Sequence, residues 1–237
     1  ANAIESTIKF DPSTWDTPEA QKIKVKLLQS IRLLAVMPLA LPPENTILGW
    51  RPEFAGAIPA WFLQRMQAWP NLNQSIFNWV FSKIDEILFD SKSDHVSSFG
   101  MSLSGAERVL YIGNGFWKQI SEDPSDRFPF TRTANIVHEA KHADGIGHVV
   151  CDGGDFTGTH DCDSDLQGPY GTQLSYYEML LRGTLAAQAV GDTNADLLSS
   201  NEKAVLTTQM CKIILNNINN VNTALKDVFH GIVDCRF

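Results

Sequence analysis

The sequence predicts an α+β fold that is mainly helical and carries one small mixed sheet. Apolar residues recur at helical spacing over most of the chain, whereas one short stretch changes to β-branched and aromatic residues. The chain has 237 residues, of which 43% are hydrophobic and 19% charged, and this composition excludes a disordered, fibrous or coiled-coil protein. A chain of this length can bury a sizeable core, so we expect a single domain, residues 1–237.

Helices dominate the first third of the chain. The sequence Thr17-Pro18-Glu19 is a typical helix start, and the apolar residues that follow keep helical spacing until Pro38 ends the helix. The same spacing predicts two further amphipathic helices, at residues 59–69 and 72–89.

A small sheet precedes the later helices. Residues 108–112 are the best candidate strand, and residues 96–101 are a candidate partner. Beyond the breakers Pro124 and Pro129, a helix is expected at 133–143. A loop rich in Gly and Asp then extends to residue 171, and the last two helices are predicted at 174–189 and 195–219.

Charge and hydropathy exclude two classes of partner. The formal net charge is −8, and no stripe of Lys or Arg interrupts it, so we expect no nucleic-acid partner. A membrane span needs about 20 apolar residues. The best candidate, residues 33–41, contains Pro38, so we expect no span.

The four cysteines predict two local disulfides, Cys151–Cys162 and Cys211–Cys235. An even number of cysteines favours an oxidising compartment. The sequence begins Ala-Asn-Ala without methionine, as expected after removal of a signal peptide, and both features predict a secreted or periplasmic protein. Four buried free thiols in a cytosolic protein are the alternative.

The most informative segment is the spacing His138-Glu139-x-x-His142-x-x-Gly145-x-x-His148. On a helix, His138 and His142 lie one turn apart on the same face, so both imidazoles can reach one zinc ion. Glu139 points beside that face, where its carboxylate can reach a zinc-activated water and act as general base.

The third candidate ligand, His148, cannot lie on the same unbroken helix, because its side chain would then point away from the face that carries the other two histidines. Gly145 provides the break, since glycine adopts a left-handed backbone at a helix end at little cost. We therefore expect the helix to end between His142 and His148, and His148 to return to the metal.

This segment resembles the signature of the metzincin clan of zinc peptidases, in which bulky residues stand at the positions of Val137 and Ile146. The resemblance implies that the three histidines bind one zinc ion and that Glu139 is the general base. It also implies a zincin-like single domain with an active-site helix and a cleft between two lobes, residues about 1–144 and about 145–237. Residues 108–112 would be the sheet edge that holds an extended peptide.

The chain departs from the metzincin pattern at three points. Lys141 stands where glycine is usual, Val149 follows the third histidine where a polar residue is common, and no clear Met-turn follows. Met179 lies at a suitable distance along the chain, but it falls inside a predicted helix, where a packing role is expected.

A second resemblance is to the aspzincin group, which has an aspartate as third ligand. The elements Gly158-Thr159-His160-Asp161, Pro169-Tyr170-Gly171 and Asn194-Ala195-Asp196 follow in that family's order. The resemblance implies Asp161 as the third ligand and Tyr170 near the developing oxyanion. Asp161, however, lies 19 residues past His142, further than the family pattern allows.

Carboxylates in the loop raise a further alternative, a calcium site. Asp161-x-Asp163-x-Asp165 resembles the start of a calcium loop, but Leu166 and Thr172 replace the expected glycine and glutamate. A solvated loop closed by Cys151 and Cys162 is therefore the more natural interpretation of this segment.

These observations predict a secreted zinc hydrolase, an endopeptidase or amidase with one zinc ion and a peptide or protein substrate. Glu139 would take a proton from the attacking water and pass it to the leaving amine, while Tyr170 or the ion would hold the oxyanion. The alternative is a non-catalytic, zinc-stabilised secreted binding protein whose site is closed by Asp161 or Glu178.

Overall fold

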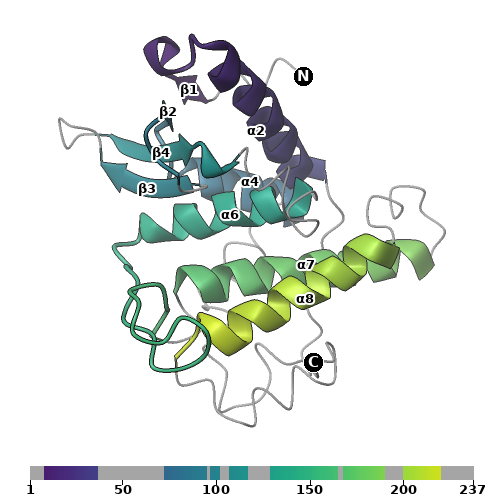
Figure 1. The fold of residues 1–237 in the computed structure, drawn as a ribbon. Helices are drawn as coiled ribbons and strands as arrows, with labels where there is room; N and C mark the ends of the chain where they lie inside the picture. Colours follow the sequence, from purple (N-terminus) through teal and green to yellow (C-terminus); the bar gives the residue numbers. More distant parts are fainter. Residues whose placement is uncertain are drawn as a thin grey trace. The chain divides into compact units, whose positions relative to one another are not determined.

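The computed structural model describes residues 8–36, 72–94, 97–101, 107–116, 129–164, 168–189 and 200–219. These residues form an α+β structure with five α-helices and a four-stranded mixed sheet (Figure 1). The chain divides into two compact units, Ala1–Val36 with Ile76–Gly145 and Met37–Ser75 with Ile146–Phe237. Within the described residues, every helix is too short or too polar to cross a bilayer.

Helix α2 (Pro18–Val36) begins where the sequence predicts it. The hydroxyl of Thr17 accepts a hydrogen bond of 3.1 Å from the backbone N–H of Ala20, so Thr17 supplies an acceptor for the first turn. The apolar stripe of the helix is almost fully buried, and it packs against helix α6 (Pro129–His142).

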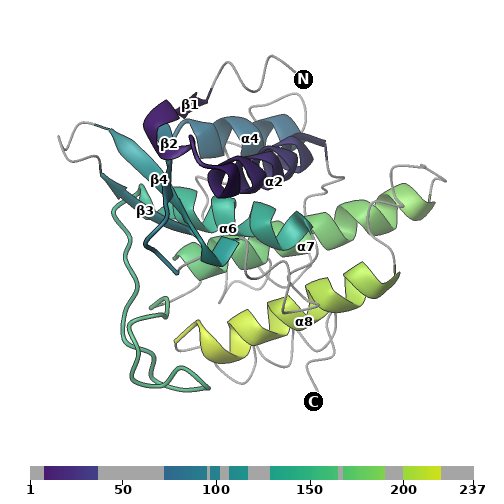
Figure 2. The same ribbon diagram turned by 45° about the horizontal axis from the view of Figure 1, so that its top comes forward.

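The sheet has the strand order β1-β2-β4-β3, and all of it belongs to the first unit (Figure 2). Strand β2 (Glu86–Asp90) is parallel both to β1 (Lys9–Phe10) and to β4 (Arg108–Gly113), whereas β3 (Ser97–Met101) is antiparallel to β4. The two predicted strands therefore pair with each other. The prediction that residues 108–112 form the sheet edge is wrong, because β2 occupies the other side of β4 and β3 is the edge of the described sheet.

The predicted helix at 72–89 is correct only in its first half. Helix α4 (Leu72–Phe81) ends at a turn in which the Ser82 hydroxyl donates to the carbonyl of Trp79, and residues 86–90 form β2. A parallel strand covered on both faces contains a continuous apolar run, and Ile87-Leu88-Phe89 fits this pattern as well as it fits a helix.

Asp85 joins β2 to β4 just before the strand begins. Its backbone N–H donates to the carbonyl of Arg108 at 2.8 Å, and its carboxylate accepts from the Arg108 backbone and guanidinium at 2.8–2.9 Å. The hydrogen bonds from the guanidinium, followed by the one from the backbone, lower the pKa of Asp85 to about 2. These bonds join residues that are far apart in the sequence, and they help to hold this segment as a strand.

Two of the later helices begin earlier than the sequence suggests. Helix α6 begins at Pro129, and helix α7 (Pro169–Ala189) begins at Pro169. The sequence predicts their starts at 133 and 174 because Pro129 and Pro169 indicate a breaker and a turn, yet proline is well tolerated in the first helical turn. Helix α8 (Ser200–Asn216) lies inside the predicted range 195–219, and the helix predicted at 59–69 lies outside the described residues.

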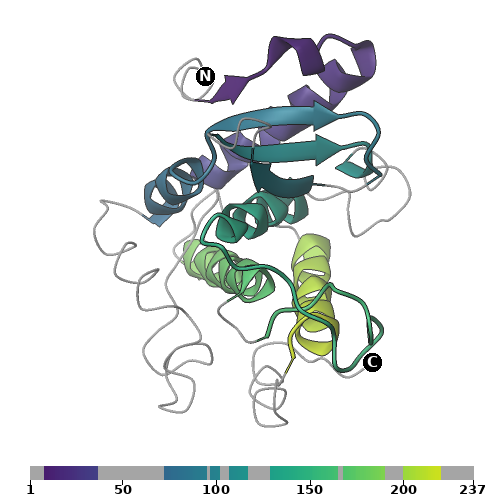
Figure 3. The same cartoon turned by 90° about the vertical axis from the view of Figure 1, so that its left-hand side faces the viewer.

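Helix α6 packs against both α2 and the edge strand β3 in the first unit (Figure 3). Its core-facing residues Ile136, Val137 and Ala140 are 0% exposed. In the second unit, α7 packs against α8. The helix that carries the histidine motif is therefore held on two sides by well-packed elements of its own unit.

Trp15 packs the segment before α2 against the sheet. It is 1% exposed, its indole N–H donates to the carbonyl of Ile87 at 3.1 Å, and its ring contacts those of Phe10 and Phe89 at centroid distances of 5.7 and 5.5 Å.

Replacing this side chain should weaken the first unit. We expect Trp15→Ala to lower the free energy of unfolding by about 3–5 kcal/mol, because it leaves a cavity and removes a buried hydrogen bond. Urea denaturation followed by circular dichroism measures this change. Val25→Ala, on the exposed face of α2, is the control and should change the value by less than about 0.5 kcal/mol. Equal stability of the two variants would contradict the role of Trp15.

Candidate metal centre

Helix α6 presents the first two histidines on one face. The rings of His138 and His142 lie one helical turn apart, with centroids separated by 5.1 Å and planes at 71°. His138 is 7% exposed and His142 is half-buried. The opposite face of the helix lies in the core, so the sequence pattern of α6 decides which way the imidazoles point.

The helix ends at His142, and Gly145 turns the chain. Gly145 has φ +78°, as the sequence predicts, and its N–H donates to the carbonyl of His142 at 3.0 Å. A Cβ at this position would meet no atom within 4 Å, so the requirement for glycine comes from the backbone conformation alone.

An ion-pair network fixes this turn. Asp144 accepts a hydrogen bond of 2.8 Å from Lys141, which is 2% exposed, and it also pairs with Lys83. Burial raises the pKa of Asp144, but the hydrogen bonds from Lys141 and Lys83 outweigh burial and leave the pKa below its usual value. Lys141, which replaces the glycine of the metzincin pattern, therefore stabilises the exit of α6.

His138, His142 and His148 form a group that could hold a metal ion. One ligand atom from each lies within 4.8 Å of the others. Imidazole nitrogens bind zinc at about 2.0–2.1 Å, and three of them are a common zinc donor set. Among the described residues this group contains neither Asp161 nor Glu178, the other ligands considered from the sequence.

Glu139 is buried beside these ligands on α6 and is 7% exposed. The hydroxyl of Ser97, at the start of edge strand β3, donates to Oε1 of Glu139 at 2.9 Å. This bond fixes the direction in which the carboxylate faces. The sequence does not indicate this role of Ser97, because 42 residues separate the pair and a single serine carries no local signal.

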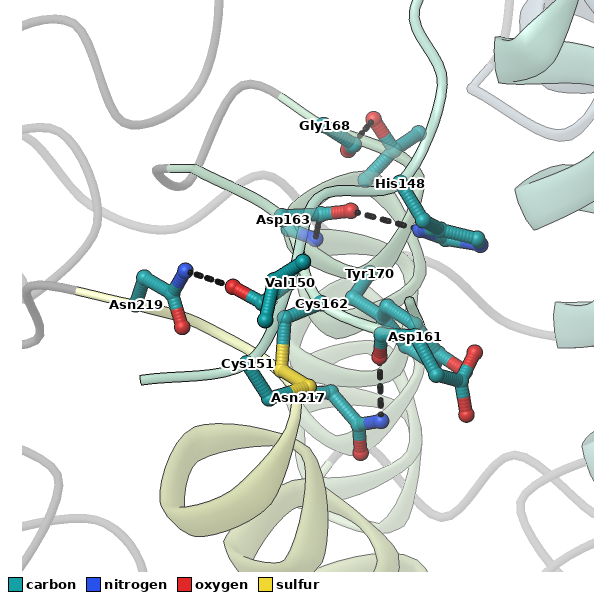
Figure 4. A network of polar contacts seen from close by, with 12 residues as sticks. His148, Val150, Cys151, Asp161, Cys162, Asp163, Gly168, Tyr170, Asn217 and Asn219 are labelled. Atoms are coloured by element: carbon teal, nitrogen blue, oxygen red, sulfur yellow. Dashed lines mark hydrogen bonds and ion pairs between the residues drawn. A yellow bond between two sulfur atoms is a disulfide. The ribbon is translucent and has the colours of Figure 1, made fainter. Parts of the chain in front are cut away.

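His148 is positioned by two residues of the second unit (Figure 4). Its Nδ1 lies 3.3 Å from Oδ1 of Asp163, and its ring lies against that of Tyr170 with centroids 5.0 Å apart. Burial raises the pKa of Asp163, while His148 and the backbone N–H of Gly171 act in the opposite direction. Asp163 is a second site residue whose role is not evident from the sequence.

Tyr170 lies in the first turn of α7, and its hydroxyl is already engaged. It donates to Oδ1 of Asp161 at 2.8 Å, so its proton points to that carboxylate. The backbone carbonyl of Asp161 accepts from the side-chain amide of Asn217 at 3.0 Å. Asp161, the third ligand implied by the aspzincin resemblance, thus binds Tyr170 in this structure.

The loop after His148 is closed by the predicted disulfide. Cys151 is bonded to Cys162, and the backbones of Val149 and Cys162 exchange two hydrogen bonds. Cys211 is also disulfide-bonded, and its predicted partner Cys235 lies outside the described residues.

The calcium interpretation of this loop finds little support. The carboxylates of Asp161 and Asp163 contact Tyr170, His148 and the start of α7, and Asp165 lies outside the described residues. Met179 is 0% exposed inside α7, where it packs in the core.

No protein-family model, curated protein or solved structure matches the chain. The assignment of function therefore rests on the geometry of this site.

The left-handed conformation of Gly145 makes a specific prediction. Gly145→Ala should destabilise the protein by about 1–2 kcal/mol, since Cβ crowds the following carbonyl in this conformation. It should also weaken zinc binding, because the turn sets the position of His148. Urea denaturation and chelator competition measure the two effects.

Gly147→Ala is the matched control. A Cβ there meets no atom within 4 Å and the backbone does not need glycine, so both quantities should stay close to those of the parent protein. An effect of the same size at Gly147 would show that the conformation of Gly145 has no special role.

Proposed function

We propose that this chain is a zinc-dependent hydrolase that cleaves amide bonds in peptides or proteins. The observation that carries the proposal is the group formed by His138, His142 and His148, with Glu139 buried next to two of them on the same helix. The proposed enzyme is metzincin-like, with a zincin-like two-lobed arrangement and an active-site helix.

The donor set fits zinc in a catalytic site. Imidazole nitrogen suits zinc, and three protein ligands leave the fourth position for water or substrate. A structural site would have a fourth protein ligand, yet Asp161 and Glu178 do not belong to the described group. This observation favours an enzyme over the zinc-stabilised binding protein. When bound, zinc would lower the pKa of a water to about 7 and polarise the substrate carbonyl.

Glu139 is the proposed general base and acid. Its carboxylate would accept the proton of the attacking water and donate it to the leaving amine. The hydrogen bond from Ser97 holds Oε1, so the carboxylate is kept in one orientation before the substrate binds. Ser97 is thus a positioning residue in the proposed reaction.

Tyr170 has a smaller part in this proposal than the sequence suggests. Because its hydroxyl donates to Asp161, it would have to leave that partner before it could donate to an oxyanion. We therefore assign the oxyanion to the metal, and we assign Tyr170 to packing against the His148 ring.

Edge strand β3 is the proposed binding place for an extended peptide. It is the last strand of the described sheet, it packs against α6, and it carries the residue that contacts Glu139. A peptide can add to such an edge through backbone hydrogen bonds. In this proposal β3 takes the role that the metzincin resemblance implies for residues 108–112.

The disulfide Cys151–Cys162 supports secretion as part of the same proposal, because disulfides persist in oxidising compartments. We propose that the enzyme acts outside the cytosol.

The identity of the third ligand gives the first test. Elemental analysis of protein purified without added metal should find about one zinc per chain. His148→Ala should lose zinc and hydrolysis together, because it removes a ligand. Asp161→Ala, the matched control in the same loop, should keep both. The opposite result, with zinc lost only in Asp161→Ala, would favour the aspzincin interpretation.

The role of Glu139 gives the second test. Glu139→Gln keeps size and hydrogen-bonding capacity but removes the base, so we expect unchanged zinc content and a fall in kcat of about 10²–10⁴. Cleavage of a fluorogenic peptide library measures the rate. Glu19→Gln, on the exposed start of α2, is the control and should keep full activity. Zinc binding without hydrolysis by the parent protein would instead indicate the binding protein.

A further inference from the structure

We propose that Asp163 is a positioning residue that holds His148 in the tautomer required for metal binding. This inference rests on the proposed zinc site. It assigns a role to a carboxylate that the sequence places only in a candidate calcium loop.

The carboxylate of Asp163 contacts two different groups with its two oxygens (Figure 4). Oδ1 lies 3.3 Å from Nδ1 of His148, a distance typical of an ion pair, and the two atoms do not have hydrogen-bond geometry. Oδ2 accepts a hydrogen bond of 2.9 Å from the backbone N–H of Gly171 in the first turn of α7. Asp163 is 1% exposed, so water does not replace either contact.

The backbone of Asp163 is fixed from both sides. Its N–H donates to the carbonyl of Asn217 at 2.9 Å, and its carbonyl accepts from the N–H of Asn219 at 3.0 Å. The preceding residue, Cys162, is held by the disulfide. The carboxylate therefore projects from a segment that cannot move without breaking several bonds.

The fold also leaves space for this carboxylate. A Cβ on Gly168 would overlap the Asp163 carboxylate, so any larger residue there would displace it. The position of the carboxylate between His148 and the start of α7 thus depends on the absence of a side chain at Gly168.

A helix cap alone does not explain an aspartate here. Asparagine could also accept a hydrogen bond from the Gly171 N–H, and burying a charged carboxylate costs free energy unless a second partner compensates. His148 is that second partner. A carboxylate at Nδ1 accepts its proton, and this leaves the lone pair on Nε2 to bind a metal. Such carboxylate–histidine contacts orient metal ligands, and their loss typically weakens metal binding about 10–100-fold.

Asp163→Asn tests the inference while keeping the helix cap. If the asparagine oxygen stays on the Gly171 N–H, the amide N–H₂ faces Nδ1 of His148 and favours the tautomer with the proton on Nε2. In the reverse orientation the amide N–H₂ would face the backbone N–H of Gly171, so two donors would oppose each other. We expect the zinc Kd, measured by chelator competition, to rise about 10–100-fold. The Tm of the zinc-free protein should stay close to that of the parent.

Asp161→Asn is the matched control, because it makes the same change two residues away, where the carboxylate contacts Tyr170. Its zinc Kd should change less than about threefold. Gly168→Ala is a second variant that keeps the charge and displaces the carboxylate, and it should weaken zinc binding as Asp163→Asn does. Unchanged zinc affinity in both Asp163→Asn and Gly168→Ala would overturn the inference.

Nitrogen-15 NMR of histidine-labelled, zinc-free protein gives a readout that does not need the metal. At a pH where the ring is neutral, His148 should carry its proton on Nδ1 in the parent and shift towards Nε2 in Asp163→Asn. A parent protein with the proton on Nε2 would overturn the inference even if the variant failed to fold. A parent that binds no zinc but shows the Nδ1 tautomer would refute the proposed function and leave the Asp163–His148 contact standing.

Discussion

The site depends on one constraint, the end of helix α6 directly after its second histidine. An unbroken helix would carry His148 to the wrong azimuth, so three imidazoles can meet only if the chain turns at Gly145. The structure shows how the first unit secures this turn: Gly145 takes the left-handed conformation, and Lys141 and Lys83 both bind Asp144. The packing of α6 against α2 and β3 then fixes the direction of His138 and His142.

The two chemical roles in the proposed site have separate supports. The first unit orients the proposed base, because edge strand β3 supplies Ser97 to Glu139. The second unit orients the proposed third ligand, because Asp163, which directly follows the disulfide-bonded Cys162, contacts His148. In both cases a side chain from another segment, half-buried Ser97 or buried Asp163, restricts the rotation of a functional group. Such restriction is what catalysis by positioned groups requires.

Local signals in the sequence predicted much of this arrangement, and long-range contacts account for most of what they missed. The start of α2, the left-handed Gly145 and the Cys151–Cys162 disulfide each depend on a few neighbouring residues, and all three are found. The sequence predicts a helix where strand β2 forms, because Ile87-Leu88-Phe89 fits both periods and pairing with β4 decides between them. The sequence does not indicate that Ser97 and Asp163 orient Glu139 and His148, since only folding brings these residues together.

The most direct measurement of the central claim is a crystal structure with diffraction data collected on both sides of the zinc absorption edge. We predict one anomalous peak, bound by His138, His142 and His148, with a water or hydroxide as the remaining ligand. The ring of His148 should also keep its contact with Asp163 when the metal is bound. The account would be contradicted by a peak ligated by Asp161 or by a fourth protein ligand such as Glu178. It would also be contradicted if zinc-loaded protein showed no metal at the three histidines.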